Sequence, residues 1–343
     1  MRTLTLRELN RATLARQLLL ERRRLSVLAA IERLVGMQAQ WPPAPYVGLW
    51  SRLRDFRRAT LERAILRGDV VKPTVMRGTL HLVTARDYPT FWAAFGEMLT
   101  WFKPEHLELA LRIVPEVQEL ARQGPLSQKA VLEHLERAHG HTDVYGRRVF
   151  YALRRHAHLL NAPETALYTT RPQAVYRLYD DPEPVDAVAA RTEIVRRYLA
   201  AFGPATRADI ADWSGLRVAD FLPSLEALEP LRRFHDENGR ELFDLPRAPR
   251  PHEDAPSPVR FLPKWDNVLL AFADRRRVIS DEHRREVIGK NGDVAPTFLV
   301  DGFVAGMWRV EAGRVRIEPF SPLPRVRRRE VEDEAARLEA WLL

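Results

Sequence analysis

The sequence predicts a mainly α-helical α+β protein, built from tandem winged-helix units and followed by a C-terminal region that contains β-strands. Three observations support this prediction. A plan of two short helices followed by a β-hairpin begins near residue 203, related plans occur earlier in the chain, and positive charge is concentrated in the first 80 residues. A chain of 343 residues is also long enough for two or three domains.

The clearest copy of the plan begins at Gly203-Pro204. Thr206 is a suitable N-cap for a short helix, and Ser214-Gly215 supplies a tight turn before a second helix with one apolar face. Asn238-Gly239 lies between two strand-like runs and suits the type I′ turn of a hairpin. Two helices followed by a hairpin are typical of a winged helix.

A second copy begins at Gly124, where Ser127 caps a helix that extends to about Ala138. Another helix is expected over Val144–His156, and the gap from Asn161 to Pro172 could hold the tip of the wing. The N-terminal part repeats the plan more loosely, with helices expected over 6–21, 27–36 and 59–67 and a two-stranded wing over 70–83.

Longer helices are expected between these units, and a Pro-rich linker over 246–258 precedes strand-like runs and a last helix over 331–343. We therefore expect four parts. They are a first winged-helix unit over 1–100, a second over 101–184, a third over 185–250 and a C-terminal β-rich region with a terminal helix over 251–343.

The composition excludes several classes of protein. The chain has no cysteine, which rules out disulfides, thiolate zinc sites and iron–sulfur clusters. It has no uninterrupted apolar run of about 18 residues and no apolar N-terminal stretch of the signal-peptide type. Neither a P-loop nor a dinucleotide-binding glycine motif is present, so no nucleotide cofactor is indicated. We expect a cytoplasmic, nucleoid-associated protein without a cofactor.

The net charge of +8 is unevenly distributed. The first 80 residues hold 16 basic and 6 acidic side chains, or +10, so the remainder of the chain is near −2. Such a local excess is typical of a protein that binds a polyanion such as DNA. A GC-rich genome would explain why arginine outnumbers lysine, but not why the excess lies at one end. Winged helices can also serve as protein-binding or structural spacers.

Gln38-Ala39-Gln40 follows the predicted end of a helix at Gly36. Trp41 precedes a proline, which disfavours helical angles, so this exit should be extended. In an extended segment Gln38 and Gln40 point to the same side. Read alone, two glutamines in a helix-exit loop are usually solvated or capping residues.

Three motifs together resemble a known family. They are Leu34–Gln40 (LVGMQAQ), Arg77–Val83 (RGTLHLV), and Phe261–Asp266 (FLPKWD) with Asp274–Val278 (DRRRV). In this order, over about residues 5 to 320, they resemble the winged-helix DNA glycosylases of the AlkZ/YcaQ type. Each motif is short and only moderately specific, but the ordered combination is much more specific.

The resemblance implies tandem winged helices that form a basic concave surface for duplex DNA. It also implies excision of N7-alkylated purines, the ability to unhook interstrand crosslinks, and catalysis by a Gln–apolar–Gln motif, here Gln38 and Gln40. Ala39 is smaller than the apolar residue expected between them.

Leaving-group chemistry gives this motif a specific meaning. A neutral amide is not a useful general base, whereas hydrolysis of an ordinary N-glycosidic bond needs protonation and carboxylate assistance. An N7-alkylguanine is already cationic and departs as a neutral base. The protein then needs only to position a water and orient dipoles toward C1′. We expect Gln38 and Gln40 to hold that water.

Further DNA-binding candidates are Arg77, Thr79 and His81, which alternate with leucines in a predicted strand and would share one face. They would line the lesion cleft, and His81 could bind phosphate when protonated. An ordinary solvent-facing strand explains the alternation equally well.

Trp41 could stack on a base or sugar, and Arg275, Arg276 and Arg277 could contact phosphates or enter a groove. Alternatively, Asp274 pairs with a neighbouring arginine and the other side chains of this cluster are solvated.

The histidine pairs His139-Gly-His141 and His156-Ala-His158 have no matching third cluster, so no metal site is expected. No lysine has an obvious Schiff-base setting, which favours a monofunctional glycosylase. Nothing resembles a dimerisation coiled coil, so we expect a monomer. The alternative is a non-enzymatic tandem winged-helix regulator, which would bind DNA tightly and sequence-specifically without releasing a base.

Overall fold

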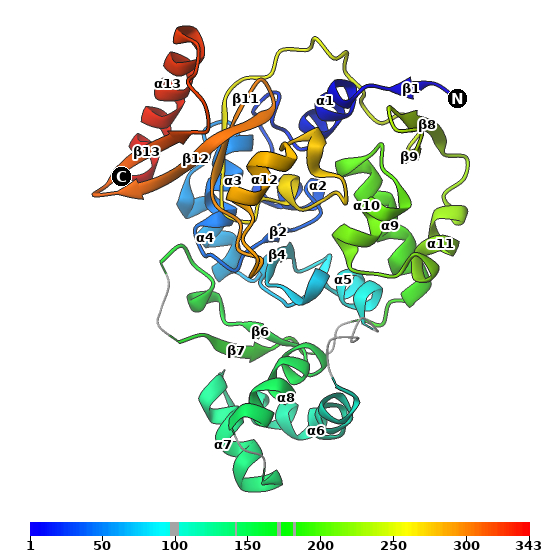
Figure 1. The fold of residues 1–343 in the computed structure, drawn as a ribbon. Coiled ribbons are helices and arrows are strands. Elements are labelled where there is room, and N and C mark those ends of the chain that lie inside the picture. Colours follow the sequence, from blue (N-terminus) through cyan, green and yellow to red (C-terminus); the bar gives the residue numbers. More distant parts are fainter. Residues whose placement is uncertain (97–102, 141–142, 170–172, 181–182) are drawn as a thin grey trace.

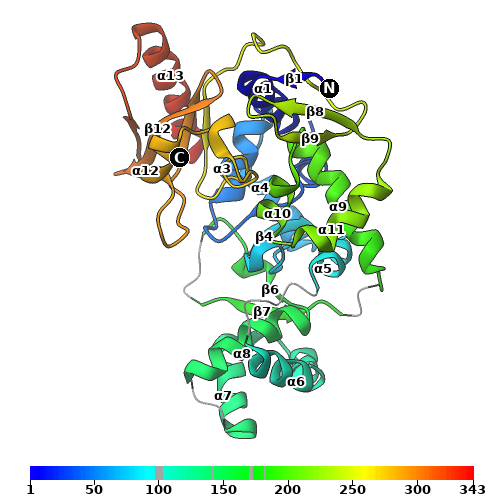
Figure 2. The same ribbon diagram turned by 45° about the vertical axis from the view of Figure 1, so that its right-hand side comes forward.

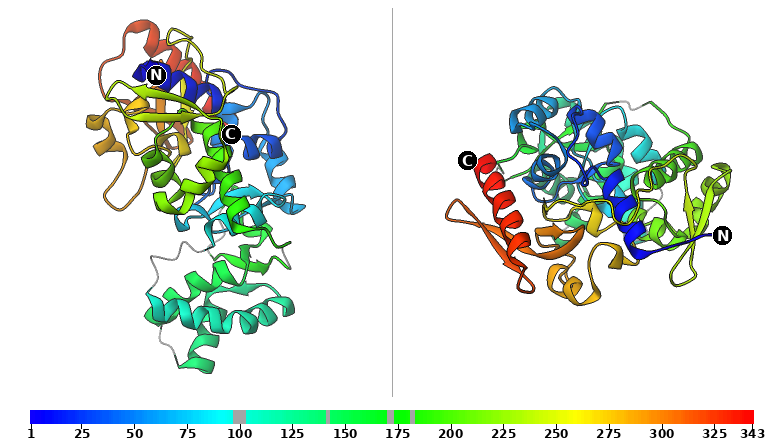
Figure 3. Two further views of the ribbon diagram at one scale, coloured as in Figure 1. Left: turned by 90° about the vertical axis from the view of Figure 1, so that its right-hand side faces the viewer. Right: turned by 90° about the horizontal axis from the view of Figure 1, so that it is seen from above.

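The computed structural model describes residues 1–96, 103–140, 143–169, 173–180 and 183–343. It has a mixed α+β fold arranged as a larger and a smaller body (Figure 1). The smaller body contains the helices and strands between residues 104 and 178, and it forms a distinct lobe in Figure 2 and in the left view of Figure 3. It packs against the larger body, where Trp92 Nε1 donates to the Arg155 carbonyl at 3.3 Å. In the described ranges, no helix is both long and apolar enough to cross a membrane.

The N-terminal part surrounds a small three-stranded sheet in the order β2-β4-β3. A capping box joins Thr5 to Glu8 at the start of the first helix, and the Ser26 side chain caps the second as expected. The helix between residues 44 and 52 was not predicted. The elements are α1 (Leu6–Arg16), α2 (Val27–Arg33), β2 (Met37–Gln38), α3 (Ala44–Arg52), α4 (Arg58–Leu66), β3 (Val70–Val71), η1 (Met76–Gly78), β4 (His81–Thr84) and α5 (Tyr88–Phe95).

The smaller body has its own hydrophobic core, made of residues between 109 and 176. The Ser127 hydroxyl accepts from the Ala130 amide and caps the helix that the sequence predicted there. The expected wing tip over Asn161–Pro172 extends into residues 170–172, which lie outside the described residues. The elements are α6 (Pro104–Gln123), β5 (Leu126–Ser127), α7 (Gln128–His139), α8 (Asp143–His156), β6 (Leu159–Asn161), η2 (Pro163–Thr165) and β7 (Val175–Leu178).

The third part has the predicted order of helix, turn, helix and hairpin, and Thr206 forms a capping box with Asp209. The first strand of the chain joins this hairpin in parallel. The elements are β1 (Thr3–Leu4), α9 (Ala187–Phe202), α10 (Arg207–Ser214), α11 (Val218–Ala227), β8 (Arg232–Asp236) and β9 (Glu241–Asp244).

The hairpin turn differs from the predicted type I′ turn. That type needs positive φ at both central residues, but within the turn only Gly239 has it, at 76°. The Gly239 amide donates to the Asp236 carbonyl, and the Asp236 carboxylate accepts from the amides of Asn238 and Arg240. The carboxylate thus stabilises a longer loop, in which only the glycine is left-handed.

The C-terminal part is an antiparallel four-stranded sheet in the order β10-β11-β12-β13, with the last helix packed beside it (Figure 1). The strand β13 was not predicted, because its alternating arginines and short apolar residues gave no continuous apolar run. The elements are β10 (Arg260–Leu262), η3 (Asn267–Leu269), η4 (Arg275–Arg277), α12 (Asp281–Val287), β11 (Thr297–Val300), β12 (Phe303–Glu311), β13 (Arg314–Pro319) and α13 (Arg325–Leu342).

The larger body is held by two hydrophobic clusters that join distant parts of the sequence. One contains Leu14, Phe202 and Leu299, and the other joins Leu34 and Leu82 to the C-terminal sheet and helix. The C-terminal part is therefore a scaffold for the N-terminal part.

Buried ion pairs account for part of the N-terminal charge excess. Arg16 Nη1 lies 2.7 Å from Asp244, and Arg52 Nη2 lies 2.8 Å from Asp266, with all four side chains buried. Arg11 pairs with Asp301 at 2.5 Å, and other arginines of α1 bind the Pro-rich segment, Arg16 to the Pro249 carbonyl for example. These arginines are not available to DNA, so the charge asymmetry of the sequence overstates the basic surface.

Candidate active site

The backbone at Gln38 is held from both sides. After α2, Val35 and Gly36 adopt left-handed angles, with φ of 59° and 80°, and turn the chain into β2. Asn267 Nδ2 donates to the Gly36 carbonyl at 3.2 Å, and Gln38 pairs with His81 across β2 and β4. The Ala39 amide then donates to the Leu80 carbonyl at 2.7 Å, while the Ala39 side chain is buried in the core.

The two glutamine side chains lie on one side of the chain, as predicted for an extended exit, and the structure further shows that they contact each other. Gln38 is 6% exposed, whereas Gln40 is exposed. Gln38 Nε2 donates to Gln40 Oε1 at 2.5 Å, and Arg77 Nη2 donates to Gln38 Oε1 at 3.1 Å.

The two hydrogen bonds link Arg77 to Gln38 and Gln38 to Gln40, and together they form a relay. Arg77 fixes the direction of this relay. A guanidinium can only donate, so the oxygen of the Gln38 amide must face it. The nitrogen of that amide therefore faces Gln40, and it requires the Gln40 oxygen as its acceptor. At the exposed end, Gln40 keeps a second lone pair on Oε1 and an amide nitrogen that has no partner in the part of the chain that the structure describes.

Arg77 does not lie in a strand, contrary to the prediction. It occupies the turn η1 with φ of 51°, and β4 begins only at His81. Its other guanidinium nitrogen donates to the Trp213 carbonyl on α10. Burial lowers the pKa of Arg77 to about 10, although nearby Asp212 opposes this effect. Arg77 is thus a partly buried cation that connects two parts of the larger body and orients Gln38.

His81 is not a phosphate ligand at neutral pH. It is 0% exposed, and burial together with the charge of Arg77 lowers its pKa to about 3. Its Nδ1 lies 3.0 Å from the Thr79 carbonyl and must carry the proton, since a carbonyl only accepts. The Thr79 hydroxyl donates to the Met76 carbonyl at 3.1 Å. Both side chains stabilise the turn that presents Arg77.

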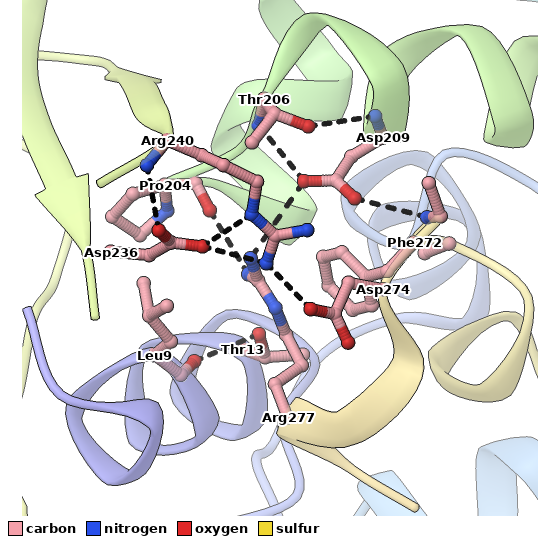
Figure 4. A network of polar contacts seen from close by, with 12 residues as sticks. Leu9, Thr13, Pro204, Thr206, Asp209, Asp236, Arg240, Phe272, Asp274 and Arg277 are labelled. Carbon is pink, nitrogen blue, oxygen red and sulfur yellow. Dashed lines mark hydrogen bonds and ion pairs between the residues drawn. The ribbon is translucent and has the colours of Figure 1, made fainter. Parts of the chain in front are cut away.

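The three arginines after Asp274 have different surroundings. Figure 4 shows Arg277 pointing into a polar network, where it is 4% exposed, donates to the Pro204 carbonyl and stacks on Phe272. Arg277 therefore cannot contact DNA, contrary to the prediction.

The other two arginines lie nearer the surface. Arg276 is 45% exposed and pairs with Asp274 at 2.6 Å, as the alternative interpretation expected. Arg275 lies 3.4 Å from Asp212 and is 19% exposed. Trp41 is partly exposed directly beside Gln40, and its carbonyl accepts from the first amide of α3.

The sequence motifs missed several residues that build the site. Asp266 binds Arg52 through both oxygens, and Asn267 holds the Gly36 turn, so the third motif supports the first. A surface depression of about 510 Å³ is lined mainly by arginines of the N-terminal part, namely Arg22, Arg23, Arg24, Arg33 and Arg54. The Arg-rich run at 22–24 was the only signal for it in the sequence.

The site presents an exposed glutamine at the end of an oriented hydrogen-bond relay, and the fold contains helix–turn–helix and hairpin units. Both features suit an enzyme that acts on nucleic acid. The family model of the AlkZ-like DNA glycosylases matches residues 31–341, and the chain belongs to this family. It is therefore a DNA glycosylase, a hydrolase of N-glycosyl bonds.

A relative from Streptomyces sahachiroi, described as an interstrand DNA cross-link repair glycosylase, is 25% identical over 94% of this chain and 92% of its own length. The solved structure of the Streptomyces sahachiroi DNA glycosylase AlkZ is similar in fold. It has a TM-score of 0.82 and 21% identity, and the match covers 99% of this chain and 97% of that one. The predicted family and the mixed α+β fold are thereby confirmed.

Proposed function

We propose that the protein excises cationic N7-alkylated purines from duplex DNA, and that Gln38 and Gln40 position the water that attacks C1′. The relay from Arg77 through Gln38 to Gln40 is the main support for this proposal. It leaves an oriented acceptor and a donor at the exposed end and immobilises the residue behind them.

The chemistry of the relay limits the substrate. Among the described residues, no carboxylate hydrogen-bonds to either glutamine, so the pair offers dipoles rather than a base. Gln40 Oε1 can accept a hydrogen bond from the water and so direct the lone pair of the water oxygen toward C1′. This assistance suffices only when the base departs as a neutral molecule, which an N7-alkylpurine does.

The DNA backbone would lie against the arginine depression of the N-terminal part. Arg24 and Arg33 are exposed there, and arginine binds phosphate in a two-pronged geometry. We propose that this depression, the partly exposed Trp41 and Arg276 form the DNA interface. The helix–turn–helix and hairpin units act as winged helices in this proposal.

Interstrand crosslinks are proposed as a further substrate. The Streptomyces relative carries crosslink repair in its description. Gln40 is exposed rather than enclosed, and a base joined to the opposite strand cannot rotate into a closed pocket.

The proposed enzyme is monofunctional. Burial lowers the pKa of Lys72 to about 8, which would favour a Schiff base, but this side chain is only 5% exposed. We expect no covalent complex when the enzyme and an abasic-site DNA are treated with borohydride. A trapped complex that K72M abolishes would show lyase chemistry instead.

The test is single-turnover excision from duplex DNA that carries 7-methylguanine, with uracil as a neutral lesion. The wild type should release 7-methylguanine and leave uracil, and Gln38→Ala and Gln40→Ala should each slow release strongly. Gln123→Ala is the matched control, because this glutamine is exposed on α6 in the smaller body. Full activity of both site variants, or tight sequence-specific binding without any release, would contradict the proposal.

A further inference from the structure

A cluster of metal-ligating side chains lies in the smaller body, apart from the candidate active site. Glu116 projects from α6, and His134 and His139 project from α7. His134 Nε2 lies 2.6 Å from one carboxylate oxygen of Glu116, and His139 Nε2 lies 2.9 Å from the other. The three ligand atoms lie within 4.8 Å of one another.

The end of α7 explains why the two histidines converge. They are five residues apart, a spacing that does not place two side chains on one face of a regular helix. His139 is the last residue of α7, and Gly140 follows with φ of 66°. The final turn lets His139 reach the same carboxylate as His134. The side chains are 19% and 21% exposed for the histidines and 40% for Glu116, so the cluster is open to ions in solution.

We propose that Glu116, His134 and His139 bind a zinc ion. Two imidazole nitrogens and one carboxylate are a common three-ligand set for Zn²⁺, with water as the fourth ligand. Zinc–nitrogen bonds of about 2.0–2.1 Å place tetrahedral ligands about 3.3 Å apart. The present nitrogen–oxygen separations of 2.6 and 2.9 Å need to open by about 0.7 and 0.4 Å to reach this spacing.

Zinc binding changes which nitrogen of each histidine carries the proton, but not the number of protons on the two rings. A carboxylate only accepts, so each Nε2 now carries a proton. On metal binding each neutral imidazole carries its proton on Nδ1 instead, and Nε2 offers its lone pair to the ion. Neither Nδ1 has a hydrogen-bond partner among the described residues, and the partial exposure of both rings lets water serve that role.

The location indicates a structural role. The cluster lies in the smaller body, whereas Gln38 and Gln40 lie in the larger one (Figure 1). In the smaller body, α8 packs against both α6 and α7, and Glu116 links α6 directly to α7. A bound ion would strengthen that link and stabilise the smaller body. This proposal departs from the sequence-based expectation of no metal site. The pair His139-Gly-His141 had no matching third cluster nearby, because Glu116 is 18 positions from His134 and the helix packing alone brings them together.

The experiment measures zinc binding by the full, untagged chain after treatment with a chelator. Calorimetry with zinc chloride should show one ion per chain with a Kd below about 1 µM. His134→Gln and Glu116→Gln should each weaken binding by at least about 100-fold, since even groups behind the ligands cost 10- to 100-fold. Cobalt should give the strong visible absorption of a tetrahedral site in the wild type, and zinc should raise its Tm.

Two control variants distinguish this site from adventitious binding. Glu119→Gln removes the same charge one turn further along α6, where Glu119 contacts Arg122 instead. His252→Gln removes a histidine that is 75% exposed elsewhere on the surface. Both should bind zinc like the wild type. The proposal is overturned if the wild type binds no stoichiometric zinc, if E116Q binds as tightly as the wild type, or if H252Q loses the ion. In those cases the cluster is a hydrogen-bonded surface triad only.

Discussion

Replacing Arg77 with methionine should separate stability from catalysis. Among the residues that the structure describes, Arg77 is the only side chain that donates to the Gln38 oxygen, so without it the amide can rotate and no longer presents its nitrogen to Gln40. A hydrogen bond to a charged group is worth about 1.5–3 kcal/mol, or about 10- to 150-fold in rate if it acts only through orientation. We expect single-turnover excision of 7-methylguanine to slow by that factor.

The stability of Arg77→Met should not fall in parallel. Burial lowers the pKa of Arg77, so folding disfavours the charge of this side chain. A methionine of similar length removes that cost while it loses the bond to the Trp213 carbonyl. We expect the free energy of unfolding in urea to stay the same or to rise.

The assay combines three measurements: the excision rate, DNA affinity by fluorescence anisotropy and urea unfolding. Arg275→Met is the matched control, because Arg275 lies near Arg77 but contacts Asp212 rather than a glutamine. Arg77→Lys should give an intermediate rate. The reasoning is refuted if Arg77→Met excises at the wild-type rate, or if Arg275→Met slows excision equally without loss of affinity.

The remaining predictions address the relay, the buried histidine, the turn and the interface. Gln40→Glu should retain most excision activity, because the new carboxylate still accepts the hydrogen bond from Gln38. Gln38→Glu should be slower, because a carboxylate cannot donate to Gln40. Equal excision rates of the two variants would contradict a fixed relay direction. His81 has a folded pKa of about 3 against about 6.5 when unfolded, so the unfolded state binds more protons between these values and stability is lost as pH falls below 6.5. By pH 5 this loss is about 2 kcal/mol, and urea unfolding of His81→Gln should lack it. Asn267→Ala should slow excision and leave DNA affinity unchanged, since it frees the Gly36 turn; a wild-type rate would exclude this role. Arg24→Ala should lower the salt dependence of DNA binding by about one ion, and an unchanged slope would remove Arg24 from the interface.

The sequence alone determined most of the local structure. Caps at Ser26, Ser127 and Thr206 marked helix starts correctly, because a capping hydroxyl acts within its own first turn. The helix–turn–helix and hairpin near residue 203 followed from the same local rules. The family followed from the order of three motifs, and the convergence of Gln38 and Gln40 followed from the geometry of an extended backbone.

Only the tertiary structure decided what the charged side chains do. Arginine is the residue type expected on a DNA-binding surface. The side chains of Arg16, Arg52 and Arg277 are instead buried against carboxylates and carbonyls more than 70 positions away. Charge counting cannot detect such pairs, since a buried arginine and an exposed one look the same in sequence. The role of Arg77 was hidden for the same reason: its function depends on the amide that it faces across the fold, and this neighbour is set by packing rather than by sequence spacing.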